Sequence, residues 1–334
     1  MPRVAVLGAG SWGTALAVHL SRVGHDVQLW SRDPALAADI ASRRANSVYL
    51  PDVSLPDSVS VTSSLESAVA KTDLVVSAIP SHGCRAVIRA AAPYFRPRAT
   101  IVSATKGLES GTLLRMSEVI AQELGDNRAV VVLSGPSFAS EVARKLPTVV
   151  VAASADAAAI ELVQAEFKSP LFRLYGSPDV IGVEICGALK NVIAIAAGVV
   201  AGLGLGHNAL AALITRGLAE ISRLACASGG QRDTTAGLSG LGDLVLTCTG
   251  RLSRNHHVGV ELARGRSLAD ILAGMKMIAE GVKTTHAALA LGERHDVELP
   301  IATQMAAVLD GRTDVRSAVD ALMVRRQKAE SESV

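Results

Sequence analysis

Two lysines lie in sequence settings that are unusual for a cation. Lys190, with Asn191 beside it, interrupts the apolar stretch ICGALKNVIAIAAG. A charge in such a core-like segment is costly unless it has a partner or a chemical role. Lys106 follows the apolar run of IVSATKGLE, where a lysine is either an ordinary surface residue or a cation beside a ligand. Lys190 therefore predicts a buried partner or a function, and Lys106 leaves both interpretations open.

A segment rich in glycines and hydroxyls provides groups that recognise an anion. It is SGLGDLVLTCTGRLSRN, and it contains Asp243, Thr247, Ser253, Arg254 and Asn255. An arginine grouped with hydroxyls and an amide is suited to a phosphate or a carboxylate. Ser253 is also suited to capping a helix, and Arg254 to lying on the surface. The adjacent pair His256-His257 lacks the i, i+4 spacing of a helical metal site, so we expect no metal.

The segment GPSFASE, Gly135 to Glu141, also follows a run that is typical of a strand. Its Ser137 is either a ligand-binding hydroxyl or the N-cap of the short helix that follows. Taken alone, the N-cap is the better interpretation.

The glycine-rich turn GAGSWG predicts a dinucleotide site. It follows the apolar run VAVL, opens an Ala- and Leu-rich helical stretch, and is followed by a second apolar run, DVQLW. In this context Gly8 permits the tight turn, Gly10 lets backbone amides approach a pyrophosphate, and Gly13 lets the helix pack close to the strand. The N-terminus of the helix then offers free N–H groups to the anion.

The choice of dinucleotide depends on the residues after DVQLW. An acidic residue there would bind the ribose 2′-hydroxyl of NAD, but the chain continues Ser31-Arg32-Asp33-Pro34. Ser31 and Arg32 are suited to the 2′-phosphate of NADP, whereas Asp33 before a proline is typical of a helix N-cap. We therefore expect NADP to be accepted, and NAD is left open.

Composition limits the class of protein. The 334 residues are 49% hydrophobic and 19% charged, with a net charge of +2 and no long basic run. A nucleic-acid partner is therefore not expected. The cysteines show no metal-ligand spacing and are typical of reduced thiols; they are Cys84, Cys186, Cys226 and Cys248. The glycine-rich turn begins too early to leave room for a cleavable leader, so we expect a folded cytoplasmic protein.

One uncharged stretch, Asn191 to Thr215, is long enough to suggest a membrane span. Many of its positions are Ala or Gly, and GLGLGHN, which begins at Gly202, breaks it in two. Two buried core helices are the better interpretation, and no integral membrane segment is expected.

Two kinds of pattern divide the chain. Up to about Ala152, helical stretches alternate with the short runs VAVLG, DVQLW, DLVVSAI, TIVSAT, AVVVLSG and TVVVAA. Such apolar strands between helices are typical of a doubly wound, mainly parallel α/β sheet that binds ligands at the carboxyl ends of its strands. After LFRLYG, long Ala-rich runs predict helices only. We expect a Rossmann domain over residues 1–178, an all-helical domain over 179–325 whose apolar helices make a homodimer reasonable, and a polar tail over 326–334.

Taken together, these segments resemble the NAD(P)-dependent glycerol-3-phosphate dehydrogenase family. The shared motifs, in chain order, are GAGSWGTALA, SATKGLE, SGPSFASE, ALKNVIAIAAG, GLGLGHN, GLGDLVLTCTGRLSRN and IAEGVKT. The resemblance runs from Val4 to about Ile301. It implies an enzyme that interconverts dihydroxyacetone phosphate and sn-glycerol 3-phosphate with NADH or NADPH, for glycerophospholipid synthesis, on a Rossmann domain followed by a helical domain.

The same resemblance implies roles for particular residues. Lys190 would be the proton donor or acceptor, with Asn191 and Thr247 as further contacts. Around the substrate it implies Lys106, Gly135, Ser137, Lys190, Asp243, Ser253, Arg254 and Asn255. Around the cofactor, beside the glycines of the turn, it implies Ser11, Trp12, Arg32, Lys106, Ala139, Arg254, Ile278 and Glu280.

Two alternative functions are weighed against this one. Another two-domain dehydrogenase, acting on a hydroxy acid, would share the layout but not the segment SGLGDLVLTCTGRLSRN. A non-catalytic dinucleotide sensor would leave Lys106, Lys190 and Asp243 without a common purpose. In an enzyme, burial and Lys106 would lower the pKa of Lys190, whereas Asp243 would raise it. The sequence leaves the net direction open.

Overall fold

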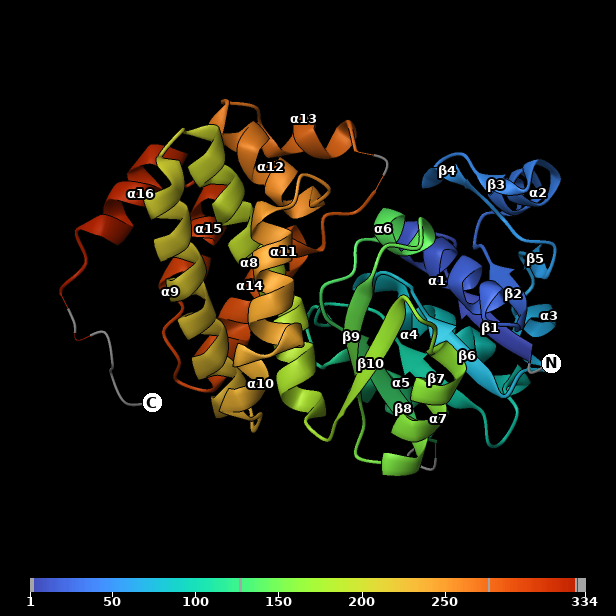
Figure 1. Ribbon diagram of the computed structural model, residues 1–334. Helices are drawn as coiled ribbons and strands as arrows, with labels where there is room; N and C mark the ends of the chain where they lie inside the picture. Colours follow the sequence, from blue (N-terminus) through green and yellow to red (C-terminus); the bar gives the residue numbers. More distant parts are fainter. Residues whose placement is uncertain (1–2, 126–127, 276, 328, 330–334) are drawn as a thin grey trace.

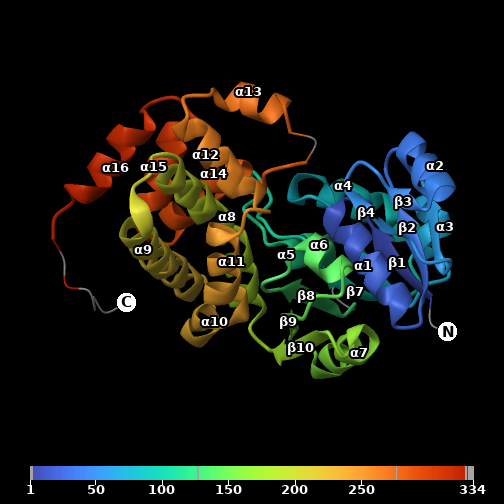
Figure 2. The same ribbon diagram turned by 45° about the horizontal axis from the view of Figure 1, so that its top comes forward.

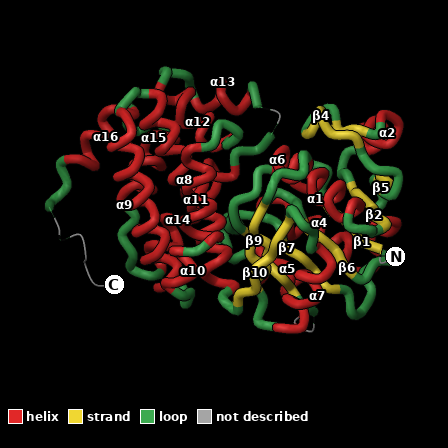
Figure 3. Tube along the Cα trace, viewed as in Figure 1, coloured by secondary structure: helices red, strands yellow, loops and turns green. Residues whose placement is uncertain are grey.

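The computed structural model describes residues 3–125, 128–275, 277–327 and 329. A sheet with helices around it forms one half of the molecule, and a bundle of helices forms the other (Figure 1). Figure 3 shows the same division by secondary structure, with the strands confined to the half that contains the N-terminus. The expected order, a doubly wound α/β part followed by a helical part, is confirmed.

An eight-stranded sheet with the order β10-β9-β8-β7-β6-β1-β2-β5 forms the centre of the first half. Neighbouring strands are parallel except for the β8–β9 pair, which is antiparallel. The strands are β1 (Arg3–Leu7), β2 (Asp26–Trp30), β5 (Val59–Thr62), β6 (Leu74–Ser77), β7 (Thr100–Ser103), β8 (Val130–Ser134), β9 (Thr148–Ala153) and β10 (Phe172–Ser177). All six predicted strands are present.

The two edge strands, β5 and β10, are not among the strands predicted from the sequence. Both have one side only partly covered, and exposed residues alternate with buried ones along β10. An edge strand of this kind lacks the continuous apolar run that marks the central strands of a parallel sheet. The sequence pattern therefore indicated the interior of the sheet and not its edges.

The chain changes direction across the sheet between β1 and β6. It continues from β1 to β2 and β5 on one side, and from β6 to β7 and β8 on the other. Because these strands are parallel, the loops that follow Leu7, Ser77, Ser103 and Ser134 leave from the same edge of the sheet. This reversal of strand order is where α/β proteins bind their ligands.

Helices cover both faces of the sheet, because successive residues of a strand point to opposite sides. Val4 and Val6 of β1 pack with the first helix and its neighbours, whereas Ala5 and Leu7 pack with the third to fifth helices. These helices are α1 (Ser11–Arg22), α2 (Pro34–Arg43), α3 (Leu65–Val69), α4 (Ser81–Ala91), η1 (Ala92–Tyr94), α5 (Met116–Leu124), α6 (Ala139–Ala143) and α7 (Ala157–Phe167). A small antiparallel pair, β3 (Ala45–Asn46) and β4 (Leu50–Ser54), lies apart from the main sheet.

The second half contains only helices among the residues that are described. They are α8 (Val180–Gly202), α9 (Gly206–Ala227), α10 (Arg232–Ala236), the π-helical turn η2 (Leu238–Gly242), α11 (Asp243–Thr249), α12 (Arg254–Ala263), α13 (Leu268–Ala273), α14 (Glu280–Arg294), α15 (Pro300–Leu309) and α16 (Val315–Met323). Figure 2, from a second direction, shows α8 among the other helices, and it packs against α9, α11, α12 and α14.

Helix α8 begins where Asp179 accepts a hydrogen bond from the Gly182 amide at 2.8 Å. In the described part of the chain it is the one helix long and apolar enough to cross a membrane, with a mean hydropathy of 1.8, but 89% of its apolar window is buried in the protein. The expectation of a buried core helix is confirmed for α8. It is wrong for α9, which packs against α8 with one side and exposes Ala211, Ala212 and Thr215 on the other.

The sheet ends at Ser177 and α8 begins at Val180, and on this basis we propose the boundary between two domains at residues 178 and 179. Most of the predicted polar tail, 326–334, lies outside the described residues. The cysteines are free thiols, of which Cys226 is half-buried and the other three are buried.

Candidate active site

Asp243 binds two lysines that come from different halves of the molecule. Its Oδ2 accepts a hydrogen bond from Lys106 Nζ at 2.6 Å, and its Oδ1 accepts one from Lys190 Nζ at 2.6 Å. Lys106 lies in the loop after β7, and Lys190 lies in the middle of α8. The carboxylate is 1% exposed. The buried partner predicted for Lys190 is therefore Asp243, and the interpretation of Lys106 as an ordinary surface lysine is excluded.

Local helix geometry completes the environment of Lys190. Asp243 and Thr247 are four residues apart on α11, so their side chains lie on one face. The Thr247 hydroxyl donates to the Asp243 backbone carbonyl at 2.6 Å and accepts from Lys190 Nζ at 2.8 Å. The ammonium is thus held by two oxygens of one short helix, inside a core of apolar side chains.

The environment lowers the pKa of Lys190 to about 8. Burial is the main cause, because it disfavours the charged form, and the positive charge of Lys106 acts in the same direction. The negative charge of Asp243 opposes both. The direction that the sequence left open is therefore downward. Such a lysine still carries its proton at neutral pH, and it releases the proton far more readily than an exposed lysine does.

Gly135 and Ser137 lie next to Lys106. The Gly135 carbonyl accepts hydrogen bonds from Lys106 Nζ at 2.9 Å and from the Ser137 hydroxyl at 3.0 Å. The expectation that Ser137 caps the following helix is wrong, because α6 has Phe138 at its N-cap and no side-chain cap. The hydroxyl turns back to its own loop, where it shares the Gly135 carbonyl with Lys106.

A chain of amides lies beside Lys190. Asn255 Nδ2 donates to Asn191 Oδ1 at 2.9 Å, and its Oδ1 accepts from the Gly281 amide at 2.9 Å. Asn255 is on α12 and Gly281 is in the first turn of α14. Asn191 and Asn255 therefore hold α8, α12 and α14 together next to the lysine.

Ser253 and Arg254 are side by side in the chain but differ in setting. Ser253 is buried and caps α12, accepting a hydrogen bond from the His256 amide at 3.2 Å. Arg254 is exposed, and no acceptor binds its guanidinium within the described residues. The surrounding protein nevertheless lowers the pKa of Arg254 by desolvation, and the charge of Glu280 opposes this. Arg254 is thus a cation without a protein partner there, one residue from the amide chain.

The glycine-rich turn has the geometry that its sequence predicts. Gly8 has a φ of +114°, and a Cβ there would lie 2.7 Å from the Ala78 carbonyl oxygen of the neighbouring loop. A Cβ on Gly13 would lie 1.8 Å from the Gly8 carbonyl oxygen, so any side chain would break the close packing of turn and helix. A Cβ on Gly10 would meet nothing within 4 Å, and α1 starts there without a side-chain cap. Backbone N–H groups of the first turn are therefore free to bind an anion.

Other predicted cofactor residues gather around this turn. The indole Nε1 of Trp12 is buried and has no hydrogen-bond partner in the part of the chain that is described. The Ser11 hydroxyl donates to Met277 Sδ at 2.9 Å, which brings the segment before α14 onto the turn. Ile278 follows Met277 and is 38% exposed. Helix α6, which starts at Ala139, packs against α1.

Glu280 binds the start of α4. Its carboxylate accepts from the Ser81 hydroxyl at 2.6 Å and from the Ser81 amide at 3.3 Å. A Cβ on Gly107 would lie 3.4 Å from Glu280 Oε2, so Glu280 is also close to the residue after Lys106.

Arg32 stands apart from the lysines, at the end of β2, and is exposed. Asp33 is the N-cap of α2, since its carboxylate accepts from the Ala35 amide at 2.9 Å. Ser31 is buried, and its hydroxyl donates to the Asp33 carbonyl at 3.2 Å. Of the two roles considered for Asp33, the cap is confirmed.

Two residues near the site were missed by sequence reasoning. Ser81 follows β6 at the switch point, so its place after a strand was a usable signal. Met277 carried none, because a methionine after a helix is most often a packing residue.

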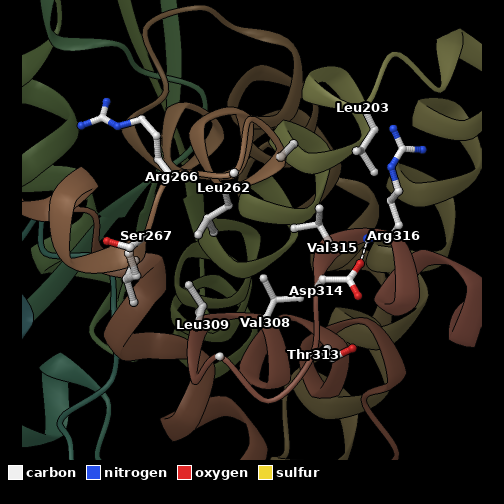
Figure 4. A pocket seen from close by; sticks show the side chains of 14 residues that line it. Leu203, Leu262, Arg266, Ser267, Val308, Leu309, Thr313, Asp314, Val315 and Arg316 are labelled. Carbon is white, nitrogen blue, oxygen red and sulfur yellow. Dashed lines mark hydrogen bonds between the residues drawn. The ribbon is translucent and has the colours of Figure 1, made fainter.

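A pocket of about 440 Å³ lies elsewhere, in the helical half, and contains none of these residues. Figure 4 shows its apolar floor of Leu262, Val308 and Leu309, with the guanidinium groups of Arg266 and Arg316 turned away from it. Of its polar lining residues, Ser267 and Asp314 are the N-caps of α13 and α16.

The fold and the site define a class of protein. A dinucleotide turn at the switch point of an α/β sheet, joined to a helical part that carries a buried lysine able to release a proton, is the arrangement of a two-domain nicotinamide-dependent dehydrogenase.

Comparison with known proteins identifies the family. The family model described as NAD-dependent glycerol-3-phosphate dehydrogenase N-terminus matches residues 3–160, and the corresponding C-terminus model matches residues 179–320. The chain belongs to the NAD-dependent glycerol-3-phosphate dehydrogenase family, as the resemblance in sequence predicted.

Similar proteins agree over the full length. A protein of Koribacter versatilis named glycerol-3-phosphate dehydrogenase [NAD(P)+] is 52% identical, over 99% of each chain. A protein of Geobacter sulfurreducens with the same name is 51% identical, over 98% of each chain. The crystal structure of glycerol-3-phosphate dehydrogenase from Coxiella burnetii superposes with a TM-score of 0.94 at 39% identity, covering 97% of this chain and 99% of that one.

Proposed function

We propose that this chain reduces dihydroxyacetone phosphate to sn-glycerol 3-phosphate with NADH or NADPH, reversibly. The observation that carries the proposal is the pair of lysines on Asp243, at the edge of the sheet where the dinucleotide turn also lies. A carbonyl reduction needs a proton donor beside the oxygen that gains charge, and Lys190 is such a donor. The names of the two relatives with about half of their residues identical support the same reaction.

The turn and the first helix fit a dinucleotide. The uncapped first turn of α1 and the unpartnered indole N–H of Trp12 are suited to its pyrophosphate. When bound, the reduced nicotinamide supplies a hydride to the C2 carbonyl carbon of the substrate. Asp33 is engaged as a helix cap and Arg32 is exposed, so we propose that the 2′-phosphate of NADP binds Arg32 and that NADPH is accepted at least as well as NADH.

Lys190 completes the reduction. As the hydride bonds to C2, the carbonyl π electrons move to the oxygen, and Lys190 Nζ gives its proton to that oxygen. In the reverse direction the neutral amine takes the hydroxyl proton. Asp243 and Thr247 orient the amine through their hydrogen bonds, and Lys106 adds positive charge where the oxygen becomes negative.

The substrate phosphate is assigned to Arg254. A guanidinium binds phosphate with two parallel hydrogen bonds, and Arg254 has no competing acceptor among the described residues. We propose that Gly135, Ser137 and Asn255 line the rest of the substrate site. Since the Asn255 amide is already bound at both ends, its part is chiefly to hold the neighbouring groups in place.

We further propose that the product supplies glycerophospholipid synthesis, and that the protein acts in the cytoplasm as a homodimer. The partly uncovered side of α9 supports a second copy as its partner. Analytical ultracentrifugation would show a monomer if the dimer proposal is wrong.

The function is tested by mixing the purified protein with NADH or NADPH and one carbonyl compound, and following the absorbance of the reduced nicotinamide. We expect rapid loss with dihydroxyacetone phosphate and little with dihydroxyacetone or with 2-oxo acids. Rapid loss with a 2-oxo acid instead would favour a hydroxy-acid dehydrogenase. Binding of the dinucleotide without loss for any carbonyl would favour a sensor.

A further inference from the structure

A buried carboxylate on the same helix as Lys190 has no part in the site described above. Glu184 lies in the first turns of α8 and is 5% exposed. Its carboxylate accepts hydrogen bonds from Arg115 Nη1 at 2.8 Å, from the Ser117 hydroxyl at 2.5 Å and from the Ser117 amide at 2.8 Å. Arg115 and Ser117 are at the start of α5, in the sheet half. Glu184 therefore joins the two halves of the molecule.

Arg115 closes the loop that Lys106 opens. Leu108 and Arg115 form an antiparallel bridge, and the Glu109 amide donates to the Leu114 carbonyl at 2.9 Å inside it. Leu108 is 3% exposed and belongs to the apolar core of the helical half. The loop from Lys106 to Arg115, which we call the lysine loop, thus belongs to the sheet half by chain and to the helical half by packing.

The lysine loop is attached to the helical half at both ends. At its first residue, Lys106 binds Asp243, which also binds Lys190. At its last residue, Arg115 binds Glu184. Glu184 and Lys190 are both on α8, and six residues of helix separate them by about 9 Å along the axis. The position of Lys106 relative to Lys190 therefore depends on both attachments.

Both oxygens of Glu184 are in use. Oε1 accepts from the Ser117 amide, and Oε2 accepts from Arg115 and from the Ser117 hydroxyl. Burial raises the pKa of Glu184, and the charge of Arg115 and the hydrogen bonds of Ser117 oppose the rise. Truncating the side chain would leave the Ser117 amide in the first turn of α5 without an acceptor, and it would leave Arg115 with Glu118 as its remaining carboxylate. The lysine loop would lose its ion pair with α8 and keep the bond of Lys106 to Asp243 and the packing of Leu108.

We propose that Glu184 is a positioning residue: it holds the lysine loop against α8 so that Lys106 and Lys190 share the Asp243 carboxylate in the geometry that proton transfer requires. The inference rests on the proposed reaction. A displacement of about 1 Å in a reacting group lowers rates by about 10². Loss of Glu184 is therefore expected to reduce turnover by about 10- to 100-fold, without contact to the dinucleotide turn.

The test compares Glu184→Ala and Glu184→Gln with a matched variant, Glu220→Ala. Glu220 is also a buried carboxylate, 4% exposed, that accepts from the backbone at the start of a helix, with the Ile301 amide at 2.6 Å. Its partners lie within the helical half, far along the chain from the lysine loop. We measure the thermal unfolding midpoint of each variant first. We then measure kcat, both KM values and the pH profile of kcat at a temperature below the midpoint of every variant.

We expect Glu184→Ala to lose kcat as stated, with the KM for the dinucleotide within twofold of wild type. The pH at which kcat for reduction begins to decline should be higher than in wild type, because a displaced Lys106 no longer lowers the pKa of Lys190. Glu184→Gln should recover part of kcat, since its amide oxygen still accepts from the Ser117 amide. Glu220→Ala should keep kcat near wild type at a similar loss of unfolding midpoint.

Equal losses of kcat in Glu184→Ala and Glu220→Ala, or a kcat in Glu184→Ala within twofold of wild type, would overturn the inference. If Glu184→Ala does not fold, Glu184→Gln and Arg115→Met are compared with Glu220→Gln by the same criteria. A wild-type protein that is inactive with dihydroxyacetone phosphate would overturn the proposed function and this inference with it. The two failures are distinct, because the wild-type protein remains active when only the role of Glu184 is wrong and is inactive when the proposed function is wrong.

Discussion

Lys190 Nζ lies 2.6 Å from Asp243 Oδ1, although 53 residues separate the two in the chain and they belong to different helices. Both side chains are buried. Without Asp243, burial and Lys106 together would drive the lysine toward its neutral form. With Asp243, the pKa of Lys190 is lowered to about 8 and no further. The carboxylate thus keeps the proton on the lysine at neutral pH while leaving it easy to transfer.

Removing the ammonium of Lys190 should abolish efficient proton transfer. Lys190→Met keeps most of the length of the side chain, and we expect turnover of dihydroxyacetone phosphate to fall by about 10² to 10⁴. The dissociation constant of the dinucleotide, measured by fluorescence titration, should not change, because Lys190 has no contact with the glycine-rich turn. Lys71→Met, at an exposed lysine, serves as the control. Normal turnover in Lys190→Met would remove the proton-transfer role.

The two directions of the reaction should depend on pH in opposite ways. Reduction needs the ammonium form of Lys190, which is present below its pKa of about 8. The turnover for reduction should therefore be level below pH 8 and fall about tenfold per unit above it, whereas the turnover for oxidation should rise with pH up to that point. Parallel profiles in the two directions would contradict the assignment.

Charge changes around Lys190 should move this profile in predictable directions. Asp243 raises the pKa of Lys190 and Lys106 lowers it. Asp243→Asn should therefore shift the fall in reduction to lower pH, and Lys106→Met should shift it to higher pH. Because the resemblance in sequence implies that both residues lie beside the substrate, the rate is expected to change as well, and the measured quantity is the midpoint of the profile. Shifts of the same sign in both would show that a different group titrates.

Arg254 should distinguish a phosphorylated substrate from an unphosphorylated one. Loss of a partner to a desolvated charge costs roughly 2 to 5 kcal/mol. Arg254→Ala should lower kcat/KM for dihydroxyacetone phosphate by a factor equivalent to roughly 2 to 5 kcal/mol. The slow reaction with dihydroxyacetone should be nearly unchanged. The affinity for the dinucleotide is measured alongside, since a contact with the cofactor is also proposed for this residue. If both substrates lose equally, the phosphate assignment is wrong.

Arg32 should set the preference for NADPH. The exposed guanidinium is available to a 2′-phosphate, and we expect Arg32→Ala to raise the KM for NADPH by about tenfold while the KM for NADH changes little. Asp33→Asn is the matched control, because asparagine also caps helices. If Asp33 only caps α2, Asp33→Asn keeps the wild-type KM for NADH. If the Asp33 carboxylate binds the ribose, Asp33→Asn raises the KM for NADH.

Glu220 should make stability depend on pH. Burial raises its pKa to about 7 from an ordinary value of 4.5. The folded-state pKa is the higher one, so the stabilisation is present below pH 4.5 and is lost as pH rises through 7, by at most about 3 kcal/mol. Urea unfolding between pH 5 and 8 should show that Glu220→Gln becomes more stable relative to wild type as pH rises. A constant difference would contradict the raised pKa.

The sequence by itself determined the elements and the motifs, because both depend on neighbours in the chain. The six central strands, the dinucleotide turn and the change to helices after Gly176 were all readable from apolar periodicity and glycine spacing. The cap at Asp33 was readable from the proline that follows it. The edge strands were not, since half-covered strands lack the apolar run.

Only the tertiary structure decided what the polar groups do. The partners of Lys190, the contact of Glu280 with Ser81 across 199 residues and the attachment of Glu184 to the lysine loop all join segments distant in the chain. Ser137 had the right type and place for a helix cap, but the fold turned its hydroxyl to Gly135. A side chain's pKa and partners depend on burial and on charges brought near by packing, and local sequence carries no record of either.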